Sequence, residues 1–352
     1  MTESDQARTR RGAAPTLEDV ARAAGVSRQT VSNVLNAPQR VRPDTRQRVE
    51  QFIDRLGYQP NRIAQALRAN DSRMIGYRFK PLTHHALASI HDRFLHALSE
   101  WGATADRHLL LFSAPDTAAE VEMCAKLRRS GAAEAFVLYD IEADDDRPTA
   151  LLERGLSFVA FGRTASGTDQ YSWVDVDNTA GIEAAVAHLA ERGHRRIGYV
   201  GLPEGHNVGG RRAQGWHKAI ARRALNGNGL DVRGPDTVAS GTELAFGLLG
   251  QPDPPTAVVA ATDTLAVGVM RAALQWGLDV GRDLAVVGFD DTPTAAALDL
   301  SSIRQPIEDV GREVMSVLAT LGPRPDAFAP AATLLTPSLT VRSSSASRAP
   351  QR

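Results

Sequence analysis

The chain has 352 residues, of which 43% are hydrophobic and 23% charged, so it is long enough for two or three globular domains. Residues 1–70 carry 12 arginines and lysines against 7 acidic residues, a net charge of +5, and the remainder carries −6. This asymmetry suggests that only the amino-terminal region meets a polyanion. A lone cysteine, Cys124, excludes an internal disulfide framework and a multi-cysteine metal site.

The start of the chain, MTESDQARTRR, has no apolar core and therefore does not read as a secretion signal. No apolar run approaches the roughly 18 residues of a membrane span. These features favour a reduced, cytoplasmic setting without a membrane partner.

Residues 16–36, TLEDVARAAGVSRQTVSNVLN, predict two short helices. Apolar residues recur from Leu17 at positions i, i+3, i+4 and i+7, and Thr16 precedes them as an N-cap. Gly25 breaks this helix, and Ser27 caps the next. Two short helices joined at a glycine turn are typical of the helix-turn-helix unit.

The second of these helices has a polar face that suits DNA. Such a face enters the major groove in helix-turn-helix units, where its side chains bond to base edges and phosphates. The alternative is a pair of ordinary amphipathic helices with a solvated side. The face consists of Arg28, Gln29, Ser32, Asn33 and Asn36.

A loop over residues 37–42 leads to a third helix, which begins at Pro43 and ends at Gly57. Its apolar face, formed by Val49, Phe52, Ile53 and Leu56, is predicted to complete a small core with the first two helices. The following segment, YQPNRIAQALRANDS, can form a short helix that is marginal alone. Two copies could fold together over a DNA minor groove, where a leucine wedged between base steps would kink the duplex.

From Met74 onward, strand-like runs such as AFVLYD, RIGYVG and LAVVGFDD alternate with helical segments such as VEMCAKLRRSG and TAGIEAAVAHLAERG. This alternation predicts parallel sheets covered by helices on both faces, and the length suits two lobes. Ligands bind such sheets at the carboxyl ends of strands. Polar residues at those ends are Arg163, Asp177, Thr262, Asp263, Asp290 and Asp291.

The segments DVARAAGVSRQTVSNVLN, VRPDTRQRV and LGYQPNRIAQALR together resemble the lactose-repressor (LacI) family of bacterial regulators. The later segments RRAQGW, ATDTLAVG, LAVVGFDD and TLLTPSLTVRSS look like the effector domain of that family, which is similar to periplasmic sugar-binding proteins. The resemblance covers roughly residues 15–343. It implies an all-α helix-turn-helix head followed by a two-lobed α/β, periplasmic-binding-protein-like effector domain.

The resemblance also implies the domain limits. A head at 15–59 and a hinge helix with linker at 60–72 precede an effector and dimerisation domain at 73–343, between disordered tails at 1–14 and 344–352. The first lobe takes about 73–174 and 305–330, and the second about 175–304 and 331–343.

The DNA contacts follow from family positions. Leu67 matches the intercalating leucine of the hinge, and Arg28, Gln29 and Asn33 match positions that set base preference. The full predicted set is Thr16, Ser27, Arg28, Gln29, Thr30, Ser32, Asn33, Asn36, Asn61, Arg62, Ala64 and Leu67.

For the effector, Arg212 matches a family arginine that bonds hydroxyls or carboxylates, and its alternative is a surface arginine like Arg211. Asp290 matches the acidic contact of the family, although Asp290 or Asp291 could instead cap the next turn. Asp263 is expected to cap the helix that begins at Thr264. Weaker candidates are Arg163, Trp216, Thr262 and Phe289. For the two aromatic residues, core packing is the favoured interpretation. Asp177 and Asn178 are expected to cap a helix.

One segment departs from the family. The first effector strand leads into GYRFKPLTHH, which is basic and short, and this puts the contacts from the first lobe in doubt. The histidines His84, His85, His91 and His96 have no credible metal-ligand spacing. No nucleotide-binding, zinc-protease or nucleophile-elbow motif is present, so neither a metal, a cofactor nor an enzymatic activity is predicted.

The sequence thus predicts a homodimeric repressor, cytoplasmic and associated with the nucleoid when bound to DNA. Its expected partners are a palindromic double-stranded operator, a second copy of itself and a small-molecule effector, with a sugar as the leading class. Alternatives are a purine-type effector, a sugar-binding protein without regulatory DNA binding, and an enzyme on a related scaffold. Whether the effector releases the DNA or is required to hold it stays open.

Overall fold

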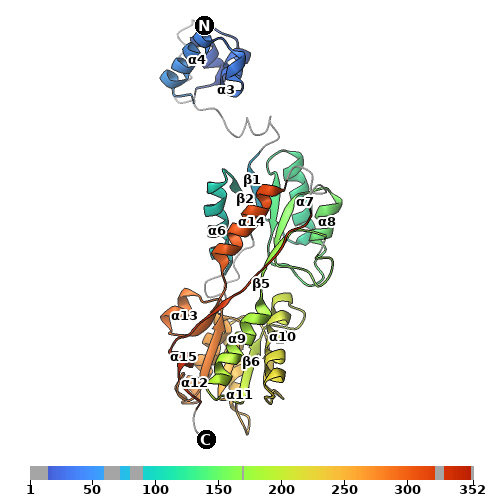
Figure 1. The fold of residues 1–352 in the computed structure, drawn as a ribbon, viewed down its shortest axis with the longest axis vertical. Helices are drawn as coiled ribbons and strands as arrows, with labels where there is room; N and C mark the ends of the chain where they lie inside the picture. The colour runs from blue at the N-terminus through green and yellow to red at the C-terminus, as the bar shows by residue number, and fades with distance from the viewer. Residues whose placement is uncertain (1–14, 59–71, 80–89, 169, 322–328, 350–352) are drawn as a thin grey trace, which may run out of the picture. The chain divides into compact units, whose positions relative to one another are not determined.

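The structure is a computed structural model that describes residues 15–58, 72–79, 90–168, 170–321 and 329–349. Contacts divide the chain into two compact units, residues 1–71 and 72–352, which are taken in turn below (Figure 1). The predictions for the tail at 1–14 and for hinge residues 60–71 lie outside the described residues.

The first unit is helical, and its helix ends are those expected from the sequence. Thr16 caps the first helix: its hydroxyl accepts the Asp19 N–H at 3.3 Å, while the Asp19 carboxylate accepts the Thr16 N–H at 3.0 Å. Gly25 and Gly57 end their helices in the left-handed conformation. A short 3₁₀ helix occupies part of the expected loop. The elements are α2 (Leu17–Ala24), α3 (Arg28–Asn36), η1 (Pro38–Arg40) and α4 (Pro43–Leu56).

Val20, Val31 and Val49, one from each long helix, are fully buried and form the centre of the head. The expectation that Leu56 belongs to this core was wrong, because its side chain is 37% exposed. Tyr58 instead packs into the cluster after Gly57 turns the chain.

The second unit contains two lobes, each built on a six-stranded sheet. In the first lobe the strand order is β11-β5-β4-β3-β1-β2, and all neighbouring strands are parallel, as the alternation of strands and helices predicted. Its strands are β1 (Met74–Arg78), β2 (His108–Phe112), β3 (Ala135–Leu138), β4 (Phe158–Phe161), β5 (Trp173–Val176) and β11 (Ala332–Leu335).

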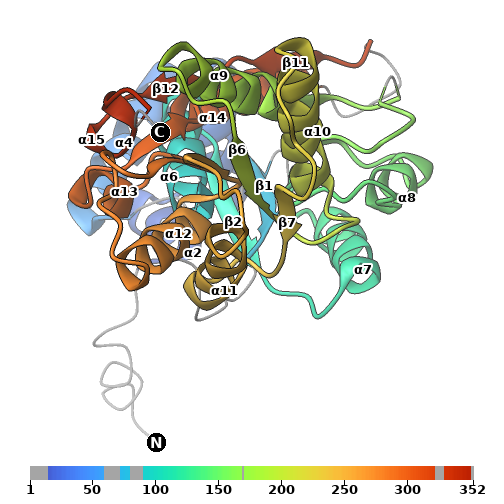
Figure 2. The ribbon, with the colours of Figure 1, turned by 90° about the horizontal axis from the view of Figure 1, so that it is seen from below.

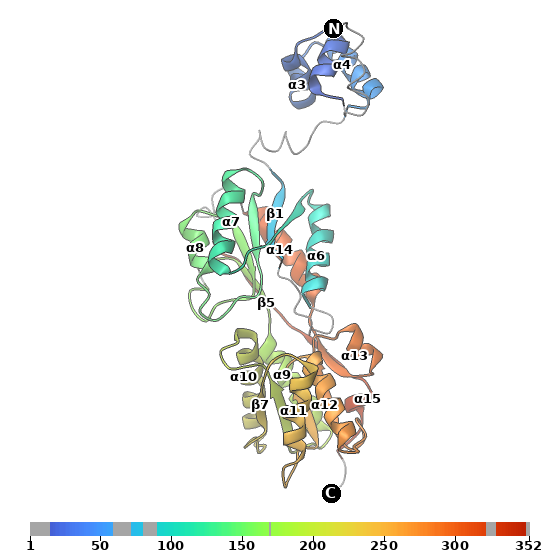
Figure 3. The ribbon, with the colours of Figure 1, turned by 180° about the vertical axis from the view of Figure 1, so that it is seen from behind.

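Helices cover both faces of the first sheet (Figures 1 and 3). On one face Phe94 and Val310 are buried against the strands, and on the other Cys124 and Leu151 are buried. The lone cysteine is therefore a core residue. The helices are α6 (Ile90–Thr104) and α14 (Ile307–Thr320) on the first face, with α7 (Thr117–Arg129) and α8 (Arg147–Glu153) on the second.

The second lobe repeats this pattern with the order β12-β10-β9-β8-β6-β7, in which only the edge strand β12 is antiparallel. Figure 2 shows α9 and α10 on one face of this sheet and α11 and α12 on the other. The strands are β6 (Ile197–Gly201), β7 (Asp231–Arg233), β8 (Ala257–Ala260), β9 (Ala285–Phe289), β10 (Ser301–Arg304) and β12 (Ser338–Thr340). The helices are α9 (Asn178–Glu191), α10 (Asn207–Arg222), α11 (Val238–Leu249), α12 (Asp263–Gln275), α13 (Pro293–Ala297) and α15 (Ser343–Ala346).

The chain passes between the lobes three times: after β5, after β10 and between β11 and β12. Residues 331–343 were expected in the second lobe, and for β11 this prediction was wrong. Its residues pair in parallel with β5, from Ala332 opposite Trp173 to Leu335 opposite Val176, so they complete the first sheet.

The sequence suggested a disordered tail at 344–352, and for residues 344–349 this prediction was wrong. Ser344 and Ser345 are buried in the second lobe, where the Ser344 hydroxyl donates to the carbonyl of Val286 at 2.7 Å. The Ser345 hydroxyl lies 2.8 Å from His188 Nε2. Within the described part of the chain, no helix is both long enough and apolar enough to cross a lipid bilayer.

Candidate functional site

The first candidate surface is the polar side of α3 in the head. Ser27, Arg28 and Gln29 are exposed at its start, while Thr30, Ser32 and Asn33 are half-buried along it. Ser27 caps the helix by accepting the Thr30 N–H at 3.1 Å, and Gln29 Nε2 donates to Asn33 Oδ1 at 3.1 Å. Thr16, exposed at the start of α2, and Asn36, the last residue of α3, complete the described part of the predicted set.

This surface presents hydrogen-bonding groups from a helix that is fixed by its apolar side. Val31 and Val34 anchor α3 in the head, so the residues between and before them face outward. Such an arrangement matches a recognition helix that reads base edges in a major groove. The hinge residues predicted to contact DNA, Asn61, Arg62, Ala64 and Leu67, lie outside the described residues.

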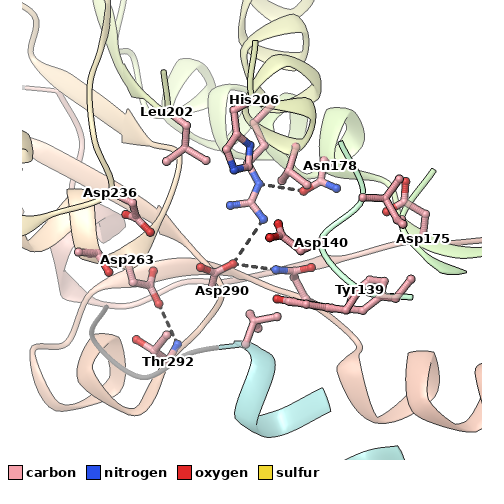
Figure 4. A pocket seen from close by; sticks show the side chains of 18 of the residues that line it. Tyr139, Asp140, Asp175, Asn178, Leu202, His206, Asp236, Asp263, Asp290 and Thr292 are labelled. Carbon is pink, nitrogen blue, oxygen red and sulfur yellow. Dashed lines mark hydrogen bonds and ion pairs between the residues drawn. The ribbon is translucent and has the colours of Figure 1, made fainter. Parts of the chain in front are cut away.

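The second candidate site is a cavity of about 430 Å³ in the second unit, lined by both lobes (Figure 4). Such a volume lies within the range of about 300–1,000 Å³ that is usual for small-molecule sites. It opens at the carboxyl ends of β3, β4, β6 and β9, where ligands bind α/β sheets. The polar lining residues are Asp140, Asp175, Asn178, His206, Arg212, Asp236, Asp263, Thr264, Asp290, Thr292 and Gln305.

Arg212, on α10, is the guanidinium that lines this cavity. It is only 4% exposed, and each of its nitrogens has an acceptor: Nε donates to Asn178 Oδ1 at 2.8 Å and Nη1 to the carbonyl of Ala261 at 2.5 Å. Nη2 donates to Asp290 Oδ1 at 3.4 Å. The ring of Phe289 lies 3.7 Å from the guanidinium carbon and supports it as a cation–π partner.

Asp290 follows β9 and faces Arg212 across the cavity. Its carboxylate also accepts a hydrogen bond from Gln305 Nε2 at 2.7 Å. The pKa of Asp290 is raised to about 7, mainly by burial and also by the charge of nearby Asp263, against the lowering effect of Arg212. Its backbone φ is +112°, a conformation that strains any residue with a side chain, so the surroundings must hold it there.

Asp263 is the centre of the network that holds this turn. Its carboxylate accepts the Thr292 N–H at 2.8 Å and the Ser302 hydroxyl at 2.6 Å, and Ser302 in turn accepts the Asp291 N–H at 3.0 Å. Desolvation by burial raises the pKa of Asp263 as well. The turn that presents Asp290 is thus fixed from below by buried hydrogen bonds.

The expectation that Asp263 caps a helix beginning at Thr264 was wrong by one residue. Thr262 is the N-cap, accepting the Leu265 N–H at 3.1 Å, and its hydroxyl donates to Asp236 at 2.5 Å. Thr262 therefore positions Asp236 rather than lining the cavity itself. Asp177 caps α9 as expected, whereas Asn178 lines the cavity and orients Arg212.

Three other predicted effector residues do not line the cavity. Arg163 donates to Asp175 at 3.0 Å, and that carboxylate lines the cavity in its place. Trp216 is 1% exposed and stacks on Tyr199 in the core of the second lobe. Phe289 is fully buried beneath Arg212. Both aromatics thus follow the core-packing alternative.

Several residues that line the cavity were not predicted from the sequence. Tyr139 and Asp140 directly follow β3, so the rule that ligands meet the carboxyl ends of strands could have identified them. His206 and Asp236 lie in loops before α10 and α11, and no sequence pattern marks them. His206 caps α10 by accepting the Gly209 N–H at its Nδ1, at 3.2 Å.

Asp140, Glu142 and His206 place potential metal-ligating atoms within 4.8 Å of one another beside the cavity. Two of the three side chains are exposed carboxylates, and a closed structural zinc site takes four ligands. The group therefore falls short of such a centre.

Two family models match the chain. Residues 16–61 match "Bacterial regulatory proteins, lacI family", and residues 186–345 match "Periplasmic binding protein-like domain". The regulator AglR of Rhizobium meliloti is 32% identical over 306 residues, which cover 85% of each chain.

Solved structures give the same picture. A complex of the regulator CelR with cellobiose is 30% identical, with a TM-score of 0.69, and the match covers 94% of this chain and 99% of that one. A lac repressor dimer bound to operator is 26% identical, with a TM-score of 0.81 and the same coverage.

Proposed function

Because this chain belongs to the lacI family of bacterial regulatory proteins, and so is a DNA-binding transcriptional regulator and not an enzyme, we propose that it is a repressor controlled by a sugar. The observation that carries the proposal is the presence in one chain of a recognition helix with an exposed polar face and a separate cavity closed by two lobes. The head binds DNA, and the cavity binds the effector.

The DNA target is a roughly palindromic operator, since two heads related by a two-fold axis read two equivalent half-sites. The lac repressor, a structural relative, is a dimer on its operator. Selection from random DNA with the full-length protein tests this directly. A palindromic consensus is the expected result, and recovery of no preferred sequence would overturn the proposal.

Gel-shift titration of the selected sequence then assigns the contacts. Gln29→Ala is expected to lower specific affinity by about 10-fold, since a bidentate base contact is worth about 1–3 kcal/mol. Arg129→Ala, at the far end of α7 in the other unit, is the matched control and leaves affinity unchanged. Leu67→Ser tests the hinge assignment: loss of specific binding with weak electrostatic binding retained is the expected result.

The effector is proposed to be a sugar because the cavity offers buried carboxylates and one guanidinium, groups that bond well to neighbouring hydroxyls. The regulator CelR, a relative of this chain, has been solved as a complex with cellobiose. Binding favours one arrangement of the lobes, and the effector shifts operator affinity only by its differential affinity for the two arrangements. Operator titrations with and without sugar decide whether it releases or secures the DNA.

Self-association is supported by exposed apolar side chains on two neighbouring helices of the second lobe. Phe246 on α11, Leu274 on α12 and Trp276 just after α12 are 46%, 77% and 44% exposed, and the two aromatic rings lie 5.1 Å apart. Exposed apolar groups gathered in this way are typical of interfaces. Leu274→Asp is expected to shift a dimer toward monomer in sedimentation velocity; a wild-type chain that stays monomeric would contradict the proposal.

The regulator is further proposed to be cytoplasmic and, when on DNA, associated with the nucleoid.

A further inference from the structure

The cavity is lined by more carboxylates than basic groups. Carboxylates from both lobes line the same space, and Figure 4 shows Asp140, Asp236 and Asp290 among the side chains around it. Against them stand one guanidinium and one imidazole. The carboxylates are Asp140, Asp175, Asp236, Asp263 and Asp290, and the nitrogen bases are Arg212 and His206.

The charge of Arg212 is already compensated. Its three nitrogens donate to Asn178, Ala261 and Asp290, and its lower face is covered by Phe289. These bonds use three of the five N–H groups of the guanidinium, so two remain for a ligand. An anion bound there would lie close to the carboxylate of Asp290, whereas a hydroxyl would not meet that repulsion.

His206 presents one ring nitrogen to the cavity. Its Nδ1 accepts the Gly209 N–H at 3.2 Å, so Nε2 is the ring atom left for a ligand. Asp140 and Glu142 lie beside this imidazole, with carboxylate and ring atoms within 4.8 Å of one another. An anion bound at His206 would therefore meet their carboxylates as well.

The carboxylates already repel one another. Desolvation is the main cause that raises the pKa values of Asp236 and Asp290, and the charges of Asp263 and Asp236 add to the effect at Asp290. Asp140 and Asp236 are nevertheless exposed to the cavity, so a ligand can reach them. A further anion in this space would raise the repulsion, whereas hydroxyl donors would relieve it.

Building on the proposed function, we infer that the cavity selects a polyhydroxyl effector without an anionic group, meaning an unphosphorylated, uncarboxylated sugar. Asp236 and Asp290 accept hydrogen bonds from its hydroxyls, and the acidic lining rejects sugar phosphates and uronic acids. Asp236 acts as a specificity-determining residue, held by the hydroxyl of Thr262 at 2.5 Å.

The test is a calorimetric and thermal-shift comparison on the full-length protein with matched pairs. Cellobiose, maltose and glucose are each compared with a phosphorylated or carboxylated counterpart, including glucose 6-phosphate and glucuronate, and guanine and hypoxanthine are added. At least one neutral sugar is expected to bind, and its charged counterpart to bind at least about 10-fold more weakly. Tighter binding of a charged member or a purine, or no binding by any neutral sugar, would overturn the inference.

Two variants separate this inference from the proposed function. Asp236→Asn removes one charge, while its amide oxygen can still accept from Thr262. The ratio of the affinity for a neutral sugar to the affinity for its phosphate is therefore expected to fall several-fold. Glu243→Gln, which changes an exposed acidic residue on α11 outside the cavity, is the control and leaves this affinity ratio unchanged. An unchanged affinity ratio in Asp236→Asn would overturn the role of Asp236, whereas failure of the wild-type protein to select an operator would overturn the proposed function instead.

Discussion

Each lobe of the second unit contains a cluster of buried charges, and the two clusters differ in kind. In the first lobe Glu120 accepts from Arg78 and Arg147, each at 2.8 Å, and Arg147 also pairs with Asp145 at 2.6 Å. Burial alone would lower the pKa of Arg147, but these hydrogen bonds raise it, so the cluster stabilises the charged form. In the second lobe the acids around Arg212 have raised pKa values. Their charged forms are therefore under-compensated, meaning that the surrounding donors and positive charges do not offset the cost of burying them.

The difference separates a structural cluster from a binding site. The compensated charges tie β1 to α7 and α8 and do not line the cavity. The under-compensated ones do line it, and a ligand can supply the hydrogen bonds they lack. Perturbed acids in a cleft are typical of functional sites, and here the contrast arises within one polypeptide.

The largest effect is expected from the first cluster. Glu120→Gln leaves Arg78 and Arg147 buried without their shared counter-ion and should lower the free energy of unfolding by about 3 kcal/mol or more. Denaturant unfolding measures it, and sugar affinity of the folded fraction should not change. The control Glu122→Gln removes an exposed partner of Arg154 and should stay within about 0.5 kcal/mol. Equal effects of the two variants would contradict the structural role.

Next in size is the loss of sugar binding in Arg212→Ala. The sugar to measure is the neutral one that gives the largest thermal shift with the wild type. Because the variant removes a charged donor from the cavity, its affinity for this sugar should fall by about 100-fold. Stability should fall less than in Glu120→Gln, because Asp290 can take up a proton near neutral pH. Arg211→Ala is the matched control, since Arg211 donates to the carbonyls of Arg163 and Thr164 and does not line the cavity. A ligand-induced shift that survives in Arg212→Ala would place the site elsewhere.

A smaller effect is expected from pH. The pKa of Asp290 is raised in the folded state to about 7, above the ordinary value, so its contribution to stability is fully present below about pH 4 and is lost as the pH rises to about 7. The free energy of unfolding of the ligand-free protein should therefore contain a contribution that falls between about pH 4 and pH 7 and is level above that interval. Within the same interval His188 and His194, whose pKa values burial lowers, act in the opposite direction.

The Asp290→Asn variant isolates this contribution. Its amide oxygen can still accept from Arg212 and Gln305, but it no longer titrates, so the falling contribution between about pH 4 and pH 7 should be missing from its stability profile. Identical pH profiles for the two proteins would show that Asp290 does not titrate there.

The smallest effect concerns a contact between the lobes. Arg93, on α6 of the first lobe, donates to the carbonyl of Asp290 at 3.3 Å and pairs with Glu308 at 2.9 Å. Both side chains are partly exposed, so Arg93→Ala should cost less than about 1 kcal/mol of stability. It is nevertheless expected to reduce the change in operator affinity that the sugar causes, while sugar affinity changes little. Paired operator titrations measure that ratio, and an unaltered ratio would exclude Arg93 from the coupling.

Much of the fold could be predicted because local chemistry specifies it. The Thr16 and Ser27 caps, the glycines that end helices and the alternation of buried strands with amphipathic helices each follow from the residue types. The sheet to which a short strand belongs does not. The four residues of β11 carry no signal for a partner, and only the path of the chain brings them beside β5.

The cavity was harder to predict than the fold. Arg212 and Asp290 were found through their family positions, and the structure places both in the lining. Asp236 and His206 come from loops whose approach to the cavity depends on the packing of both lobes. Arg163 was chosen for its place after a strand, but its salt bridge with Asp175 holds it aside, a pairing between residues that sequence spacing does not reveal.

The late strands of the two sheets have a consequence for biosynthesis. Since β11 and β12 are neighbours in the chain but lie at the edges of different sheets, one short segment closes both lobes. A ribosome that has released everything up to α14 has therefore completed neither sheet. Both sheets therefore gain their last strand when residues 332–340 emerge, and a nascent chain stalled before that point would leave the edges of β5 and β10 uncovered at the same time.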